Sequence, residues 1–265
     1  MPILHLILVA IVQGITEFLP VSSSGHLILL PNLTGLDDQG LVIDVAVHVG
    51  TLGAVVLYFR KDVARAFSGL FRLNDLSDPR ARLALGLILA TIPVVIAGLL
   101  LKLSGLNEAM RSVAVVGWST LVFGLILYWS DQRGPETKTA DDWSLKDAIT
   151  MGFWQVLALI PGTSRSGITI TGGRQLGYTR SDAAKLAMLM SIPTILASGT
   201  LIGIDVASQM DWAAARDSAI AAAFAFVAAL GALHFMMRLL RSVSFTPYVV
   251  YRIFLGIALL IYAYA

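Results

Sequence analysis

Long apolar stretches dominate the sequence and restrict what the chain can fold into. A helix needs about 20 apolar residues to cross the hydrocarbon core of a bilayer. Six stretches reach or approach that length: 41–59, 83–103, 112–129, 183–204, 218–237 and 247–263. Only 14% of the residues are charged, against about 25% in a typical soluble domain. We therefore expect an all-α polytopic membrane protein with about six transmembrane helices.

Four further apolar stretches are too short, or too interrupted by Pro and Gly, to cross a membrane. They are 3–19, 27–33, 148–160 and 168–176. Half-helices that enter the membrane and turn back are tolerated only where protein or a water-filled cavity surrounds their ends. Polar residues gather at these breaks, so we expect four re-entrant half-helices around a polar cavity.

The loop charges predict how the chain is oriented. Lys and Arg gather in the loop 60–82, in the linker 130–146 and in the turn 238–241, whereas the segment 205–211 has two Asp and no basic residue. Positively charged loops stay in the cytoplasm. The three basic segments are therefore expected in the cytoplasm, with 205–211 and both termini outside. A net charge of +2 is too weak to indicate a nucleic-acid partner.

The most polar motif is the segment 13–26, Q-G-I-T-E-F-L-P-V-S-S-S-G-H. Gln13 and Glu17 are four residues apart, so a helix places them on one face. A proline then stops the helix, and three serines and a glycine lead to His26, a residue that can exchange protons near neutral pH. Two interpretations fit the segment. It is either a serine-capped helix end with a satisfied histidine, or a catalytic turn.

A second turn, P-G-T-S-R-S-G at 161–167, echoes the first. Each turn precedes a short apolar piece and then a long one, which predicts two repeats, 1–129 and 147–265, within one membrane domain. The linker 130–146 joins them. Three spans in each repeat is an odd number, so the repeats must insert with opposite orientation, and their turns would meet near the midplane. The alternative is that the two Pro-Gly-Ser breaks resemble each other by coincidence.

Arg165 lies inside the second turn. An unpaired Arg at membrane depth is costly, so it should have an anionic partner. That partner is either Glu17 or a phosphate, whose geometry guanidinium matches through paired hydrogen bonds. The helix that follows adds free N–H groups and a positive dipole end. Together the turns predict a phosphate site in which Glu17 holds a divalent cation such as Mg²⁺ or Ca²⁺.

The two motifs and the closing segment 244–252 resemble the bacterial undecaprenyl-diphosphatase family of the bacitracin-resistance type, over the whole chain. The resemblance implies removal of the terminal phosphate from undecaprenyl pyrophosphate, which yields the lipid carrier for cell-wall glycan synthesis. It also implies a divalent cation, an inverted-repeat fold and an outward-facing site in the bacterial inner membrane. The expected partners are the lipid pyrophosphate and the membrane, with a homodimer left open.

The residues and the resemblance together define the candidate site. The catalytic candidates are Ser23 as nucleophile, His26 as base, and Glu17. The metal candidates are Glu17 and Gln13, where the family often has a second Glu. The phosphate-binding candidates are Arg165, Ser164, Ser22, Ser24, Ser166 and Thr163.

Three residues outside the motifs have open roles. Asp44 and His48 are one turn apart, and either support the site from behind or form a helix-end pair without a role. Arg252, inside the last span, either reaches the site or extends to the membrane surface.

A transporter remains the alternative to an enzyme. Inverted repeats with broken helices are also a transporter architecture, and such a chain could flip an anionic prenyl phosphate lipid or carry a small anion. A carrier needs Arg165 and the helix ends but has little use for His26 beside a serine, which favours the enzyme.

Overall fold

The computed structural model describes every residue except 1, 36–38, 106–109, 111 and 208–210. Six helices in the described part are long and apolar enough to cross a membrane. They are α3 (Gly40–Tyr58), α5 (Pro79–Ser104), α7 (Val113–Arg133), α10 (Arg180–Ala207), α11 (Trp212–Leu239) and α12 (Thr246–Tyr264). Each coincides with a predicted span, so the prediction of an all-α polytopic membrane protein is confirmed.

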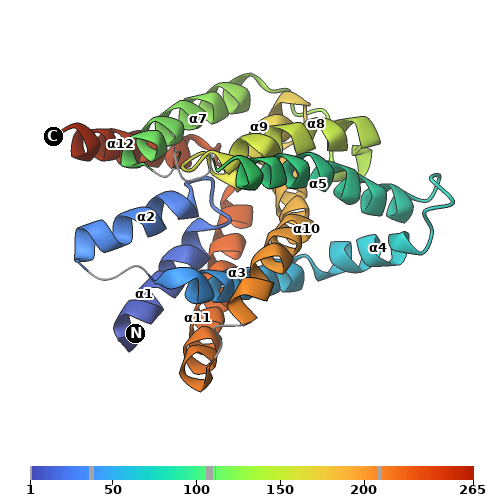
Figure 1. Cartoon of the computed structure of the whole chain (residues 1–265). Helices are drawn as coiled ribbons and strands as arrows, with labels where there is room; N and C mark the ends of the chain where they lie inside the picture. Colours follow the sequence, from blue (N-terminus) through green and yellow to red (C-terminus); the bar gives the residue numbers. More distant parts are fainter. Residues whose placement is uncertain (1, 36–38, 106–109, 111, 208–210) are drawn as a thin grey trace.

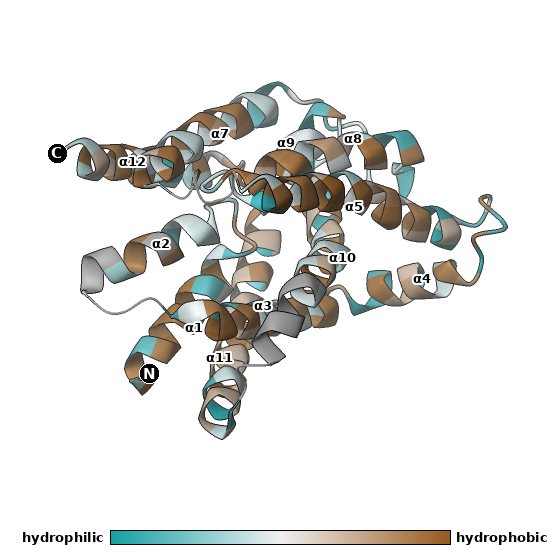
Figure 2. Ribbon diagram, viewed as in Figure 1, coloured by the Kyte–Doolittle hydropathy of each residue, from teal (hydrophilic) through white to brown (hydrophobic). Residues whose placement is uncertain are grey.

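The surfaces of these helices are consistent with a lipid environment. No more than half of the apolar window of any span is buried inside the protein. Large apolar side chains such as Leu103, Phe254 and Ile261 are mostly exposed, and Figure 2 shows hydrophobic residues along the outer faces of the long helices. Soluble proteins rarely expose apolar surface on this scale.

Four short helices overlap the predicted half-helices: α1 (Ile3–Thr16), α2 (Ser23–Thr34), α8 (Leu145–Val156) and α9 (Arg165–Gln175). The longest has 14 residues, too few to span a bilayer. Both α2 and α9 begin earlier than predicted because a serine caps each one. The apolar pattern alone places a start at the first apolar residue and misses the polar first turn.

One helix, α4 (Arg60–Leu70), lies in a segment that the sequence suggests only as a basic loop. Its Val63 and Ala66 pack toward the core, while its basic residues face outward. α4 packs against α5, and the two run side by side to their connecting turn (Figure 1). The predicted linker is also partly helical, because α7 continues to Arg133 and a 3-10 turn, η1, covers Ala140–Asp142.

The half-helices differ in how they are packed. α9 contacts α7, α8 and α10, and its residues from Ser166 to Arg174 are buried. α2 packs mainly against α1 and α7, and it lies at the edge of the molecule in Figure 1. α9 is therefore enclosed by neighbouring helices, whereas α2 is more peripheral.

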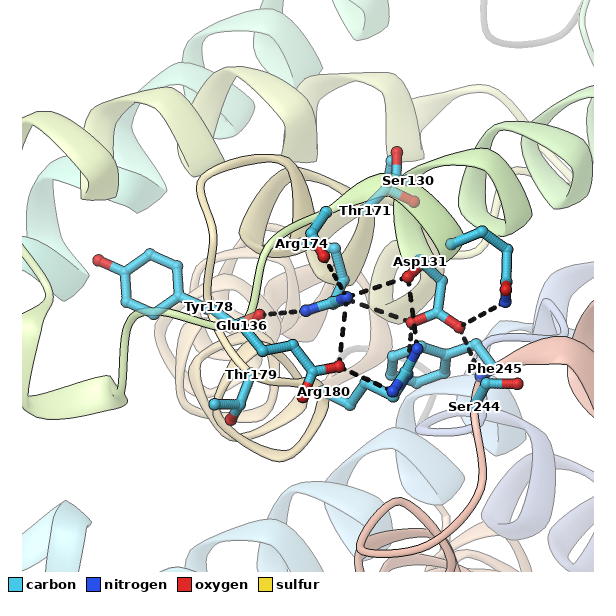
Figure 3. A network of polar contacts seen from close by, with 12 residues as sticks. Ser130, Asp131, Glu136, Thr171, Arg174, Tyr178, Thr179, Arg180, Ser244 and Phe245 are labelled. Atoms are coloured by element: carbon cyan, nitrogen blue, oxygen red, sulfur yellow. Dashed lines mark hydrogen bonds and ion pairs between the residues drawn. The ribbon is translucent and has the colours of Figure 1, made fainter.

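A buried ion-pair network holds the end of α9 that is far from the second motif (Figure 3). Asp131 on α7 is its centre, with Oδ1 accepting from Arg174 Nε at 3.2 Å and from Arg180 Nε at 2.7 Å. Its Oδ2 accepts from the Phe245 backbone N–H at 3.0 Å. One carboxylate thus joins α7, α9, α10 and the turn before α12, and this sets the position of α9.

Candidate active site

The two motif turns have the same local structure. Ser22 and Ser164 precede α2 and α9 with φ angles of 74° and 69°, the only positive φ values of non-glycine residues in the described part. Each serine Oγ accepts a hydrogen bond from the backbone N–H three residues later, in Gly25 and Gly167. Strained backbone of this kind costs on the order of 1–3 kcal/mol and is typical of functional sites.

The turns meet although they are far apart in sequence. Arg165 Nη2 donates to Glu17 Oε1 at 2.5 Å, and Ser166 Oγ donates to the Leu19 carbonyl at 3.0 Å. The ion pair between Arg165 and Glu17 is thus one of the two partnerships that the sequence predicted. Ser166, predicted to bind phosphate, joins the turns and does not line the cavity between them.

Glu17 is the centre of the site. It is 9% exposed, and while Oε1 takes Arg165, its Oε2 accepts from Gln13 Nε2 at 2.9 Å and from Ser23 Oγ at 2.7 Å. The hydroxyl proton of Ser23 is therefore directed at a carboxylate. These contacts bring together Ser23, the predicted nucleophile, and Glu17, predicted both as a catalytic residue and as a metal ligand. Gln13, the other predicted metal ligand, contacts the same carboxylate oxygen.

A small polar cavity of about 170 Å³ lies between the turns. Its lining residues are Glu17, Ser22, Ser23, Ser24, His48, Ser164 and Arg165. Arg165 Nη1 is buried and has no hydrogen-bond partner in the described structure, so this N–H is available to an anion. Thr163, also predicted to bind phosphate, is fully buried and does not line the cavity.

His26 lies apart from this cavity. Its Nδ1 is 2.6 Å from the Ser22 carbonyl oxygen and its Nε2 is 2.6 Å from the Tyr251 hydroxyl. The two rings stack with an interplanar angle of 4°. A carbonyl only accepts, so Nδ1 donates and Nε2 is left for the tyrosine. His26 braces α2 against α12 in this structure, and its role as base stays a prediction.

His48, and not His26, is the histidine that faces the cavity. Its Nε2 lies 3.2 Å from Gln13 Nε2 and 3.8 Å from Glu17 Oε2, and it lines the polar cavity. Asp44, one turn earlier, accepts from Gln39 Nε2 with its Oδ1 and lines a larger, mostly apolar cavity between α3 and α10. His48 lines this larger cavity as well, so both members of the predicted pair face it, and of the two only His48 also lines the polar cavity.

Arg252 does not extend to the membrane surface. It is fully buried, and its guanidinium donates to the carbonyls of Thr120, Pro20, Gly162 and Thr163 at 2.9–3.3 Å. Pro20 belongs to the first turn, and Gly162 and Thr163 to the second. Arg252 therefore binds both turns from behind.

Two glycines leave room for this arginine. A Cβ on Gly167 would lie 2.9 Å from Arg252 Nη1, and one on Gly124 would lie 3.2 Å from Nε. Any side chain at Gly167 would push against the guanidinium. The second glycine of the 161–167 motif thus has a packing reason that its sequence position alone does not reveal.

The residues present are compatible with a divalent cation. Glu17 offers a carboxylate oxygen, and the buried Gln13 Oε1 has no partner in the described structure. Among the described residues, no group of three or more His, Cys, Asp and Glu side chains is placed to hold a metal ion. Mg²⁺ commonly takes one or two carboxylates and completes its shell with water and substrate phosphates, and this donor set suits such an arrangement.

Fold and cavity define the class: a multi-pass α-helical membrane protein whose polar site is built from two half-helix turns. The family model described as bacitracin resistance protein BacA matches residues 6–258, so the chain belongs to this family. The family predicted from the two motifs is confirmed.

Curated relatives extend over the whole chain. This chain is 67% identical over 267 residues to the undecaprenyl-diphosphatases of Ruegeria pomeroyi and of Dinoroseobacter shibae, with 100% of each chain covered. It is 47% identical over 271 residues to undecaprenyl-diphosphatase 2 of Stutzerimonas stutzeri, with 98% of each chain covered.

Proposed function

We propose that this protein is a membrane phosphatase that hydrolyses undecaprenyl pyrophosphate to undecaprenyl phosphate and inorganic phosphate. The observation that carries the proposal is the contact of Ser23 Oγ with Glu17 Oε2 at 2.7 Å, in the same cavity as Arg165. A hydroxyl aimed at a carboxylate beside a guanidinium suits attack on a phosphate. Relatives that share 67% of the sequence are named undecaprenyl-diphosphatase.

The cavity provides several groups for the diphosphate. Among the described residues Arg165 Nη1 has no acceptor, and charge-assisted hydrogen bonds to phosphate are among the strongest in proteins. α2 and α9 both begin at the cavity, through Ser22 and Ser164, and the N-termini of helices favour anions. The serine hydroxyls that line the cavity add neutral donors.

The chemistry follows from the orientation of Ser23. A serine is a weak nucleophile unless a base takes its proton. Ser23 Oγ attacks the terminal phosphorus, its proton passes to Glu17, and the bond from phosphorus to the bridging oxygen breaks, releasing undecaprenyl phosphate. Water then hydrolyses the phosphoserine to free phosphate. A cation held by Glu17 and Gln13 would offset the charge that builds up on the phosphate oxygens.

The cellular role follows from the product. Undecaprenyl phosphate would return as the lipid carrier for cell-wall synthesis, and removal of the pyrophosphate form would confer resistance to bacitracin. The loop charges support an orientation with both termini outside, and the family resemblance favours insertion in the inner membrane with the site open to the outside. Residues 208–210 of the predicted outer segment lie outside the described residues.

The test is phosphate release from undecaprenyl pyrophosphate by the purified protein, with and without a chelator. Ser23→Ala should abolish turnover, and Ser104→Ala is a matched control because the exposed Ser104 hydroxyl donates to the Leu101 carbonyl of its own helix and does not line the cavity. Labelled phosphate should remain on acid-quenched wild type. Normal turnover by Ser23→Ala would remove the catalytic assignment, and a lipid or anion carrier would replace the enzyme.

A further inference from the structure

We propose that His48 supplies an imidazole ligand to the divalent cation of this site, together with Glu17 and Gln13. A ligand set that includes imidazole favours a transition-metal ion over Ca²⁺. This inference rests on the proposed function, since the ion would serve the same phosphate site.

Three polar atoms from α1, α3 and the first turn already surround one point. Glu17 Oε2 is 2.9 Å from the Gln13 amide nitrogen, which is 3.2 Å from His48 Nε2, and His48 Nε2 is 3.8 Å from Glu17 Oε2. Ligands about 2.1 Å from one ion are separated by roughly 3–3.5 Å in octahedral or tetrahedral shells. Two sides of the triangle are near these values, and the third needs only a small approach of His48 to Glu17.

The imidazole of His48 is oriented as a ligand. Its Nδ1 lies 2.7 Å from the carbonyl oxygen of Asp44, and because a carbonyl only accepts, Nδ1 carries the proton. The lone pair of Nε2 therefore faces the triangle. Metal-binding histidines are held by this kind of hydrogen bond from the other ring nitrogen to a carbonyl or carboxylate.

Gln13 can supply the third ligand by a rotation of its side-chain amide. The side chain is fully buried, with Nε2 toward Glu17 and His48 and with Oε1 lacking a partner in the described structure. A buried acceptor without a donor is unfavourable. Half a turn of the amide exchanges the two atoms, so that the oxygen becomes the third ligand.

The charge of the site argues against Ca²⁺. Arg165 holds Glu17 Oε1, so one shared carboxylate is the only formal negative charge in the triangle. Ca²⁺ takes six to eight oxygen ligands, whereas imidazole suits the first-row transition metals. His26 is no competing ligand, because both of its ring nitrogens are engaged outside the cavity.

Mn²⁺ binding to the full-length protein tests this directly, through the magnetic signature of a nitrogen ligand. Tag-free protein in lipid nanodiscs is titrated with Mn²⁺ by electron paramagnetic resonance, with and without methylenediphosphonate as a pyrophosphate mimic. Spin-echo modulation then reports ¹⁴N bonded to the ion. We expect imidazole modulation in wild type and in His26→Gln, and an affinity for Mn²⁺ at least tenfold above that for Ca²⁺.

Two variants separate a ligand from a mere hydrogen-bond partner. His48→Asp keeps an oxygen ligand, so it should bind Mn²⁺ without nitrogen modulation, and His48→Gln should bind at least tenfold more weakly. Thermal unfolding without metal checks that both fold. Unchanged modulation in His48→Asp, or no nitrogen coupling in wild type with or without the mimic, would overturn the inference. Neither readout depends on hydrolysis, so an inactive protein with imidazole-bound Mn²⁺ would refute the proposed function alone.

Discussion

Arg165 Nη2 and Glu17 Oε1 are 2.5 Å apart, although 148 positions separate the two residues in sequence. The side chains are 16% and 7% exposed. Either charge alone would be costly to bury, and removing one partner leaves the other uncompensated. The pair therefore couples the two motif turns, and substitutions on one turn should disturb the other.

Replacement of Arg165 by Lys should impair the enzyme strongly. Lysine keeps the charge but cannot hold Glu17 and a phosphate at once with a planar fork. Loss of one hydrogen bond to a charged group, about 1.5–3 kcal/mol, corresponds to roughly a 10- to 150-fold lower kcat/KM in the phosphate-release assay. Arg238→Lys, in the last turn of α11, is the control. Activity equal to wild type would mean that charge alone suffices at position 165.

Glu17→Gln should cost more turnover than His26→Ala. The first change removes the acceptor of the Ser23 proton, and general-base catalysis contributes about 10²–10⁴-fold. His26→Ala removes only a brace to Tyr251, so we expect a loss of less than about tenfold, matched by Tyr251→Phe. Steady-state kcat values of the three variants and of wild type measure these losses. If His26→Ala is as inactive as Ser23→Ala, His26 is the base that the sequence suggested.

Arg252→Met should damage both stability and turnover. It leaves the carbonyls of Thr120, Pro20, Gly162 and Thr163 without their donor, at about 1–3 kcal/mol for each group that finds no other partner. Arg252→Lys should recover part of the lost thermal stability in detergent but little kcat, because an ammonium cannot reach both turns. A fully active Arg252→Met protein would show that the turns keep their positions without this residue.

Asp131→Ala should destabilise the fold by about 3–5 kcal/mol, because it leaves the buried Arg174 without its main counter-charge. Unfolding in detergent measures the change. Asp141→Ala is the matched control, since the side chain of Asp141 is 80% exposed in its pair with Arg65 and such surface pairs contribute about 1 kcal/mol or less. Equal effects of the two changes would contradict a central role for Asp131.

The orientation can be tested with single cysteines, because the chain has none of its own. Ser77→Cys lies between α4 and α5, within the predicted basic loop 60–82, and Ala265→Cys lies at the exposed C-terminus. A membrane-impermeant thiol reagent applied to intact cells should label position 265 and spare position 77. Labelling of position 77 alone would reverse the proposed orientation.

The sequence alone was sufficient for the membrane class, the six spans and the two motif turns. Apolar length and turn composition are local properties, so they can be counted along the chain. It also indicated Glu17 as a partner for Arg165, because a buried cation needs an anion. α4 was missed because its apolar stripe is short and lies among charged residues that resemble a loop.

Only the tertiary structure decided which histidine faces the site. His26 is three positions from Ser23, yet its ring turns toward α12, whereas His48 reaches the cavity from α3. Sequence distance places a backbone, but the direction of a side chain depends on the helices packed around it. Arg252 shows the same limit: its carbonyl partners come from α7 and both turns, and only the packing of the last span brings them to one guanidinium.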